Sequence, residues 1–236
     1  ATARFGPPAV AGRWYRLSPR EPNATVRTAA IADVLLERHG VVTRGAVVAE
    51  GISGGFTPVY RVLAAMEERG VARRGYFIEG LGAAQFAMSG AVDRLRAPGG
   101  TGRRDGTALV LAATDPANPF GGALPWPGRA VDAGDGLPAG GPAHRAGRKA
   151  GALVVLIDGS LVLYVERGGR SVLSYTADPA TLAAAADALA VAVRAGALGS
   201  LSVERADGES IHASPLHDAL RVAGFRPTPR GLRLRG

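Results

Sequence analysis

A serine-containing turn is the first feature of this sequence that could do chemistry. Residues 51–55, GISGG, match G-x-S-x-G, the pattern in which a nucleophilic serine sits on a sharp strand-to-helix turn. The residues before Ser53 have a helical pattern, so this turn joins two helices instead. We therefore interpret its small residues as an ordinary helix-to-helix connection, with no catalytic serine.

Two further patterns bear on nucleotides and metals. GLGAAQ, residues 80–85, begins like a dinucleotide fingerprint, but Gln85 stands where the last glycine should be. No G-x-x-x-x-G-K-[ST] occurs, so we expect no ATP hydrolysis by this chain alone and no cofactor. The four histidines show no paired ligand spacing, and we expect no metal site; they lie at positions 39, 144, 212 and 217.

Arginines are the residues whose clustering carries information. The last sixteen residues hold five arginines and no acid, and a strand over GLRLRG would put Arg233 and Arg235 on one face and Leu232 and Leu234 on the other. Such a row of guanidinium groups suits phosphates, although it is also consistent with a solvated sheet edge. The candidate DNA-binding residues are Thr57, Arg61, Arg73, Arg74, Arg226, Arg230, Arg233 and Arg235.

Composition favours an anionic partner. The 236 residues carry 28 basic and 20 acidic side chains, a net charge of +8, and nucleic acid is the commonest partner of such a chain. A GC-rich genome would also enrich arginine, and Lys149 is the sole lysine.

The chain has no cysteine and no apolar run long enough to span a bilayer. Because no leader is recognisable at the N-terminus, we expect a cytoplasmic, nucleoid-associated protein without membrane contact.

Three helices are predicted in the first half of the chain. The first runs from about 25 to 39, with Ile31, Val34, Leu35 and Arg38 spacing its buried face and Gly40 as its stop. The second begins at a threonine cap at position 43 and ends at position 51.

The third predicted helix begins at a Thr57 cap, with Pro58 in its first turn and Gly70 after its end. Its apolar stripe consists of Val59, Val62, Leu63 and Met66. Two strand-like runs follow, VARRGYFIEG and AAQFAM. Three helices followed by a two-stranded ribbon is the order of a winged helix, whose third helix normally enters the DNA major groove. The acidic pair Glu67 and Glu68 at the end of this helix favours protein contacts instead.

The second half has a different periodicity. TALVLAA predicts a buried strand, and GALVVLIDGSLVLYVERGGRSVLSYT predicts three strands joined at Asp158-Gly159 and Gly168-Gly169. Asp178-Pro179 opens an alanine-rich helix that ends near Gly196, LSVERA adds a strand, and Ser214-Pro215 opens a helix that stops at Gly224.

The predicted fold class is therefore α+β, with two domains. Residues 25–96 form the winged helix, 97–106 a linker, and 107–236 an antiparallel β-barrel-like domain with two or three helices. Residues 1–24 are expected to be an extension connecting to something upstream, and residues 128–147 a mobile loop rich in Gly, Ala and Pro.

Several blocks of sequence together resemble the C-terminal region of Lhr, the large helicase-related proteins of bacteria. They are HGVVTRGAVVAEG, GGFTPVYRVLAAMEERG, ARRGYFIEGLGAAQFA, LAATDPANPFGGALPWP, GRKAGALVVLIDGSLVLYVERGGR and GFRPTPRGLRLRG. The resemblance implies a non-motor accessory region of an ATP-dependent 3′-to-5′ DNA helicase involved in repair, with the motor domains upstream. The arginine clusters indicate DNA, single- or double-stranded and without sequence preference, as a partner, and the acidic end of the third helix makes a homo-oligomer a further possibility.

The resemblance also extends to the architecture of winged-helix alkylpurine DNA glycosylases, which implies base excision as an alternative function. Those enzymes carry a catalytic Gln-x-Gln pair, whereas Gln85 is the sole glutamine here. A glycosylase needs a group that activates water, commonly a carboxylate, and Asp115 is the candidate. Aspartate before Pro116 is also the ordinary way to begin a turn. A purely structural oligomerisation domain is the third alternative.

The loop TDPANPFGGALPWP, residues 114–127, allows two interpretations. Its prolines fix φ and remove hydrogen-bond donors, so a rigid, partly buried connection sealing the second domain is the first. The other is a DNA-facing wedge in which Phe120 or Trp126 stacks on a base.

Overall fold

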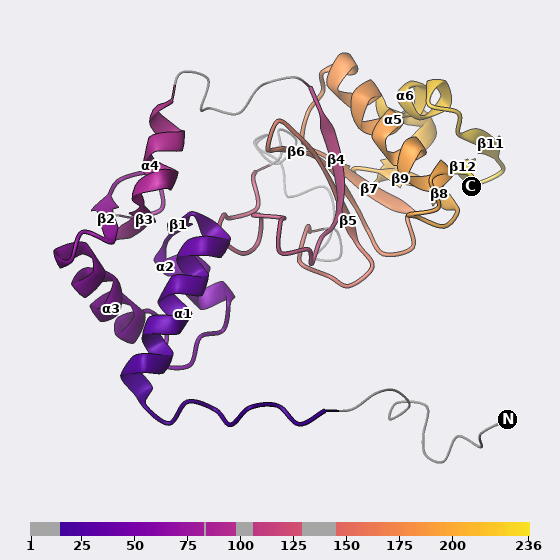
Figure 1. Ribbon diagram of the computed structural model, residues 1–236. Coiled ribbons are helices and arrows are strands. Elements are labelled where there is room, and N and C mark those ends of the chain that lie inside the picture. Colours follow the sequence, from indigo (N-terminus) through magenta and orange to yellow (C-terminus); the bar gives the residue numbers. More distant parts are fainter. Residues whose placement is uncertain (1–14, 83, 98–105, 129–144) are drawn as a thin grey trace, which may run out of the picture.

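The computed structural model describes residues 15–82, 84–97, 106–128 and 145–236, which form a winged helix and an α+β part (Figure 1). Much of the predicted N-terminal extension, linker and mobile loop lies outside the described residues. Within the described residues, no helix is both long and apolar enough to cross a membrane.

The first helix, α1, spans Ala24–His39 and begins at Asn23, whose side chain accepts hydrogen bonds from two backbone N–H groups of the first turn. Its stop at Gly40 is confirmed, with φ of 67°. The predicted buried face is wrong in part, because Val34 is 49% exposed and Arg38 is also exposed, while Ala32, Leu35 and Leu36 are buried. Both sets of positions have helical spacing, and packing against the third helix selects the second set.

The second and third helices are α2, Arg44–Ala49, and α3, Phe56–Glu68. Thr43 caps α2 as predicted, its Oγ1 accepting from the N–H of Ala46 at 3.1 Å. The predicted cap of α3 is wrong: Gly55, with φ of 66°, is the N-cap, and Thr57 lies inside the first turn. Only glycine adopts that conformation freely, so the helix begins at Gly55, two residues before the predicted cap. The buried stripe of α3 is confirmed at Val59 and Leu63.

A three-stranded antiparallel sheet completes the winged helix. Its strands are β1, Val41–Val42, β2, Ala72–Gly75, and β3, Gln85–Met88, in the order β1-β3-β2. The predicted ribbon is thus confirmed, and a helix that we did not predict, α4, Ser89–Arg96, follows it.

The second part contains a six-stranded sheet in the order β10-β9-β7-β6-β5-β4. Both glycine hairpins of the predicted meander are confirmed, since residues 158, 159, 168 and 169 all have positive φ. Its strands are β4 (Ala108–Ala112), β5 (Leu153–Ile157), β6 (Ser160–Val165), β7 (Ser171–Ser174), β9 (Arg205–Ala206) and β10 (Glu209–Ser210). Helix α5 (Pro179–Arg194) packs beside it, and α6 (Leu216–Val222), preceded by a short 3₁₀ helix, η3 (Ile211–Ala213), packs against α5.

A second, three-stranded sheet in the order β11-β12-β8 completes this part. Its strands are β8 (Leu201–Val203), β11 (Arg226–Thr228) and β12 (Gly231–Leu234). The α+β class is therefore confirmed. The sheets of the described residues do not close into a barrel, so the barrel-like description remains unconfirmed.

Each face of the six-stranded sheet has its own hydrophobic cover. Val155, Leu163 and Val165 pack against α5, α6 and the second sheet. On the other face, Val154 and Tyr164 pack against residues of the proline-rich loop. The loop thus occupies the position that a second layer of helices would otherwise fill.

Candidate nucleic-acid interface and interdomain cleft

The proline-rich loop is built around stacked aromatic rings. Phe120 is 8% exposed, and its ring stacks on Trp126 with centroids 6.2 Å apart. Trp126, partly exposed, also meets the buried ring of Tyr164 edge-on at 5.6 Å. Gly121 makes room for this stack, since a Cβ there would lie 2.4 Å from the indole nitrogen. Both predicted stacking residues therefore face the core of the second part.

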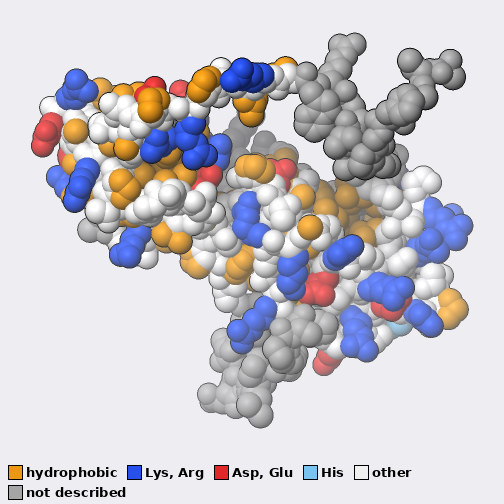
Figure 2. Space-filling view, turned by 90° about the horizontal axis from the view of Figure 1, so that it is seen from below, with side chains coloured by type: hydrophobic (Ala, Val, Ile, Leu, Met, Phe, Trp, Pro, Cys, Tyr) orange, Lys and Arg blue, Asp and Glu red, His pale blue; other side chains and the backbone are white. Residues whose placement is uncertain are grey.

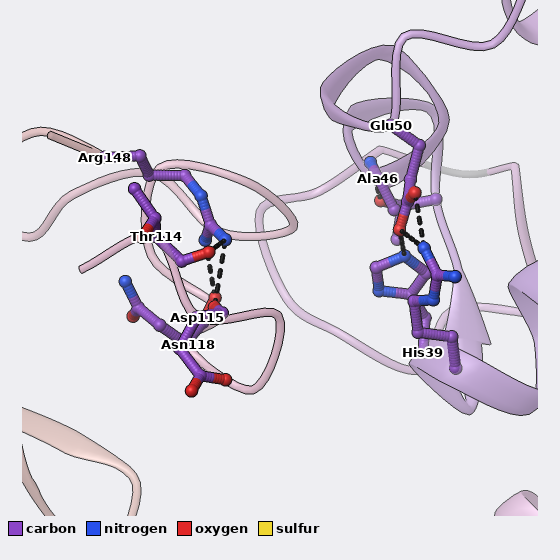
Figure 3. A network of polar contacts seen from close by, with 9 residues as sticks. His39, Ala46, Glu50, Thr114, Asp115, Asn118 and Arg148 are labelled. Carbon is purple, nitrogen blue, oxygen red and sulfur yellow. Dashed lines mark hydrogen bonds and ion pairs between the residues drawn. The ribbon is translucent and has the colours of Figure 1, made fainter. Parts of the chain in front are cut away.

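Arg148, which lies outside residues 114–127, holds the proline-rich loop in place (Figure 3). Its Nη1 donates to the carbonyls of Asn118 at 2.8 Å and Phe120 at 3.4 Å, and its Nη2 donates to those of Thr114 at 3.0 Å and Asp115 at 2.9 Å. The buried Asn118 amide adds a bond from its Nδ2 to the carbonyl of Ala113 at 2.9 Å. One guanidinium group thus satisfies loop carbonyls that lack strand partners.

Asp115, the predicted catalytic candidate, lies in this loop with its carboxylate engaged locally. Its Oδ1 accepts a hydrogen bond of 2.8 Å from the backbone N–H of Ala117. This is the turn-forming geometry that an aspartate before proline favours.

Gln85, the sole glutamine, holds the wing together. It is fully buried, and its Oε1 accepts from the N–H groups of Phe77 at 3.0 Å and Ile78 at 2.8 Å. Its Nε2 donates to the carbonyls of Ile78 and Gly82, both at 2.8 Å. The hydrogen-bonding capacity of the amide is used by the wing, which leaves it no free donor for a substrate.

The arginines of the winged helix differ in how they are engaged. Thr57, Arg61 and Arg73 are exposed. Arg74 instead forms an ion pair with Glu67 at 3.0 Å and donates to the hydroxyl of Tyr60 at 3.0 Å. The acidic end of α3 therefore neutralises a predicted phosphate contact.

The C-terminal arginines form a row on the outer face of the sheet β11-β12-β8. Arg226 lies directly opposite Arg233 in the strand register, and Arg233 lies opposite Ser202. The predicted alternation is confirmed, because Leu232 and Leu234 are buried on the other face. Arg230, in the turn between β11 and β12, and Arg235, just after β12, are exposed. No Asp or Glu occurs within these three strands.

Arg233, at the centre of this row, is incompletely satisfied. Its Nη2 donates to the Oγ of Ser200 at 3.3 Å, while its buried Nε has no hydrogen-bond partner among the described residues. The row lies at the side of the second part remote from the winged helix (Figure 1), so the two predicted groups of arginines do not come together. Figure 2 shows that Lys and Arg outnumber Asp and Glu on one face spanning both parts.

A cleft of about 690 Å³ lies between the winged helix and the loop. We did not predict it, because its walls come from segments about 70 residues apart in the sequence and neither has a recognisable motif. Its lining includes Arg38, His39, Glu50, Ile78, Pro119, Leu124 and Arg148.

Glu50 is the acidic side chain of this cleft, and it is 23% exposed (Figure 3). Nη1 of Arg38 donates to both carboxylate oxygens, at 2.7 and 2.6 Å, and Nε2 of His39 lies 3.1 Å from Oε1. The hydrogen bonds from Arg38 lower the pKa of Glu50; burial opposes this effect, and His39 adds to it. The carboxylate is therefore ionised at neutral pH. Among the described residues no cluster of metal-binding side chains is present.

The fold places the chain among winged-helix proteins with an attached α+β part. Residues 21–107 match the family model described as the winged-helix domain of the large helicase-related protein. The chain is 50% identical over 245 aligned residues to "Lhr helicase/ probable uracil glycosylase" of Mycolicibacterium smegmatis, covering 100% of this chain and 16% of that protein. It is 37% identical over 235 residues to "Lhr helicase/uracil glycosylase" of Escherichia coli, covering 97% and 14%.

Residues 21–107 therefore carry the Lhr winged-helix domain, and the chain corresponds to a C-terminal, winged-helix-containing region of the Lhr proteins to which it is similar. It spans about a sixth of the length of these curated relatives.

Proposed function

We propose that this chain is a DNA-binding, non-motor region of an Lhr helicase that acts in DNA repair. The carrying observation is the arginine row on the outer face of the sheet β11-β12-β8. Like charges directly opposite each other on neighbouring strands repel, so Arg226 and Arg233 favour an anion between or above them. The absence of acid from the three strands leaves DNA phosphates as the natural counter-charge.

This interface positions the DNA without reading its sequence. Arginines on a sheet face contact the backbone, and backbone contacts carry no direct sequence information. The exposed Arg61 and Arg73 of the winged helix supply a second contact region. Since the relatives are named helicases and this sequence lacks a P-loop, the motor belongs to the remaining part of such proteins.

A titration of labelled single-stranded and duplex DNA by fluorescence anisotropy tests the proposal. We expect binding to both forms, with log affinity falling linearly with log salt between about 50 and 200 mM as phosphates release counterions. No binding at the lowest salt would contradict a DNA interface and would favour the oligomerisation domain instead.

Base excision is the second candidate function. The names of both relatives include a uracil glycosylase, and the identity extends over essentially the whole of this chain. Gln85 is committed to the wing, so a Gln-x-Gln chemistry is not open to this chain. Hydrolysis of a glycosidic bond would then depend on a carboxylate. Release of free uracil from a uracil-containing oligonucleotide by the isolated chain tests this candidate.

A further inference from the structure

We propose that the cleft between the winged helix and the proline-rich loop receives the target nucleotide, and that Glu50 is the carboxylate that acts on it. This inference rests on the second candidate function, base excision, and assigns its site. It differs from the prediction from sequence, which placed the carboxylate at Asp115.

The cleft has the size and the surfaces that a nucleotide requires. Its volume of about 690 Å³ lies within the range of small-molecule sites, which are mostly apolar with few, well-placed polar groups. Ile78, Pro119 and Leu124 offer apolar surface for the faces of a base. Arg148 lines the same cleft, and because its hydrogen bonds go to neutral backbone carbonyls, its positive charge favours the approach of the DNA backbone.

Glu50 stands where local structure disfavours its charge. It is the C-cap of α2, and the C-terminal end of a helix carries partial negative charge. Arg38 and His39, in the last turn of α1, offset this effect and keep the carboxylate ionised. A carboxylate with a perturbed pKa that is held by two partners beside a cleft is a candidate functional group.

A purely structural role for Glu50 explains less. The ion pair joins α1 to the end of α2, but Arg38 is 46% exposed and Glu50 23%, and exposed pairs contribute little to stability. One arginine would suffice for such a link. The additional imidazole, whose Nε2 lies 3.1 Å from Oε1, fixes the orientation of the carboxylate and makes His39 a positioning residue.

The proposed step is a hydrolysis that balances without a cofactor. The bond between C1′ of the deoxyribose and N1 of uracil breaks, and its electron pair leaves with the base. Ionised Glu50 stabilises the positive charge that develops on the sugar and accepts a proton from the attacking water, whose oxygen bonds to C1′. That proton then passes to the departing base through solvent, so the products are free uracil and an abasic site.

The test measures uracil release from a single-stranded and a duplex oligonucleotide by the full chain and four variants. Glu50→Gln keeps the shape but removes the basic oxygen, and we expect release to fall by about 10²-fold or more, with DNA affinity changed less than about twofold. Glu166→Gln is the matched control, because Glu166 is also 23% exposed and ion-paired, with Lys149 at 3.3 Å. It should release uracil at the unaltered rate. Asp115→Asn should retain most of the activity.

The outcomes separate the two proposals. No uracil release by the unaltered chain would overturn both base excision and the role of Glu50. Release that is unaffected by Glu50→Gln, or lost in Asp115→Asn alone, would leave base excision standing and overturn this assignment. Circular dichroism monitors folding, and Glu50→Asp provides a second variant that retains the charge; partial activity there, with Glu50→Gln inactive, supports the proposal. Activity of Glu50→Asp no higher than that of Glu50→Gln would overturn it.

Discussion

Replacing Trp126 by alanine separates the two interpretations of the proline-rich loop. A fully buried aromatic side chain replaced by alanine costs roughly 3 to 5 kcal/mol of unfolding free energy. Trp126 is partly exposed, which reduces this cost, but its removal also eliminates the ring interactions with Phe120 and Tyr164, each contributing roughly 0.5 to 1.5 kcal/mol. Because Arg148 holds the loop in place, the cavity does not collapse. We therefore expect stability to fall by about 2 to 4 kcal/mol.

Urea unfolding followed by circular dichroism measures this change, since the substitution removes one of the two tryptophans that fluorescence would report. Val222→Ala, at a residue 83% exposed, is the control and should change stability by less than about 0.5 kcal/mol. If Trp126→Ala left stability unchanged and weakened single-strand binding by roughly 1 to 3 kcal/mol, the ring would be a base-stacking wedge and our interpretation of the loop would be wrong.

Three further predictions concern the wing, the loop and the cleft. Gln85→Leu should leave polar groups of the wing backbone without partners and cost roughly 2 kcal/mol, with faster amide exchange at Phe77 and Ile78; unchanged exchange would refute this role of Gln85. Gly121→Ala should destabilise the chain in urea, because φ is +72° and the new Cβ meets Trp126; a neutral effect would show that the loop adapts. The pKa of Glu50 is lowered on folding, so the contribution of its carboxylate to stability is complete above about pH 4.5 and is lost as pH falls through the lower folded pKa. The difference in unfolding free energy between the unaltered chain and Glu50→Gln should therefore shrink as pH falls through this range. A difference that stays constant would contradict the ion pair.

Local signals in the sequence predicted most of the elements. The dipeptides Asp158-Gly159 and Gly168-Gly169, all with positive φ, predicted both hairpins of the meander, and Gly40 and Thr43 marked the end of one helix and the start of the next. The errors arose where two local choices were equally good. The two possible faces of α1 have the same spacing, and only packing against α3 decides between Val34 and Leu36. Helix α4 lacks a side-chain cap, which is why its start was not recognised.

Candidate sites whose residues lie close together in the sequence could be predicted, whereas those assembled from separate segments could not. The row with Arg233 follows from strand alternation within one short segment, and the structure places it as expected. Ion pairing with Glu67, at the end of the preceding helix, neutralises Arg74, and the spacing of the arginines alone does not show this. The cleft is formed where the ends of α1 and α2 meet a loop far along the chain, so it had no sequence signal. The pairing of Glu50 with His39 depends on how the ends of these two helices are placed, which no motif shows.

DNA binding through the C-terminal arginine row is the central claim, and the salt dependence of one variant tests it most directly. The triple variant Arg226→Gln, Arg233→Gln, Arg235→Gln should bind duplex DNA more weakly, with the slope of log affinity against log salt reduced by about 0.9 for each phosphate that the variant no longer neutralises. A control with the same change in charge replaces three arginines that are exposed elsewhere, Arg94, Arg96 and Arg167. It should retain nearly the original slope. Equal reductions of affinity and slope in both variants would show that net charge alone attracts the DNA, and would contradict an interface on this sheet.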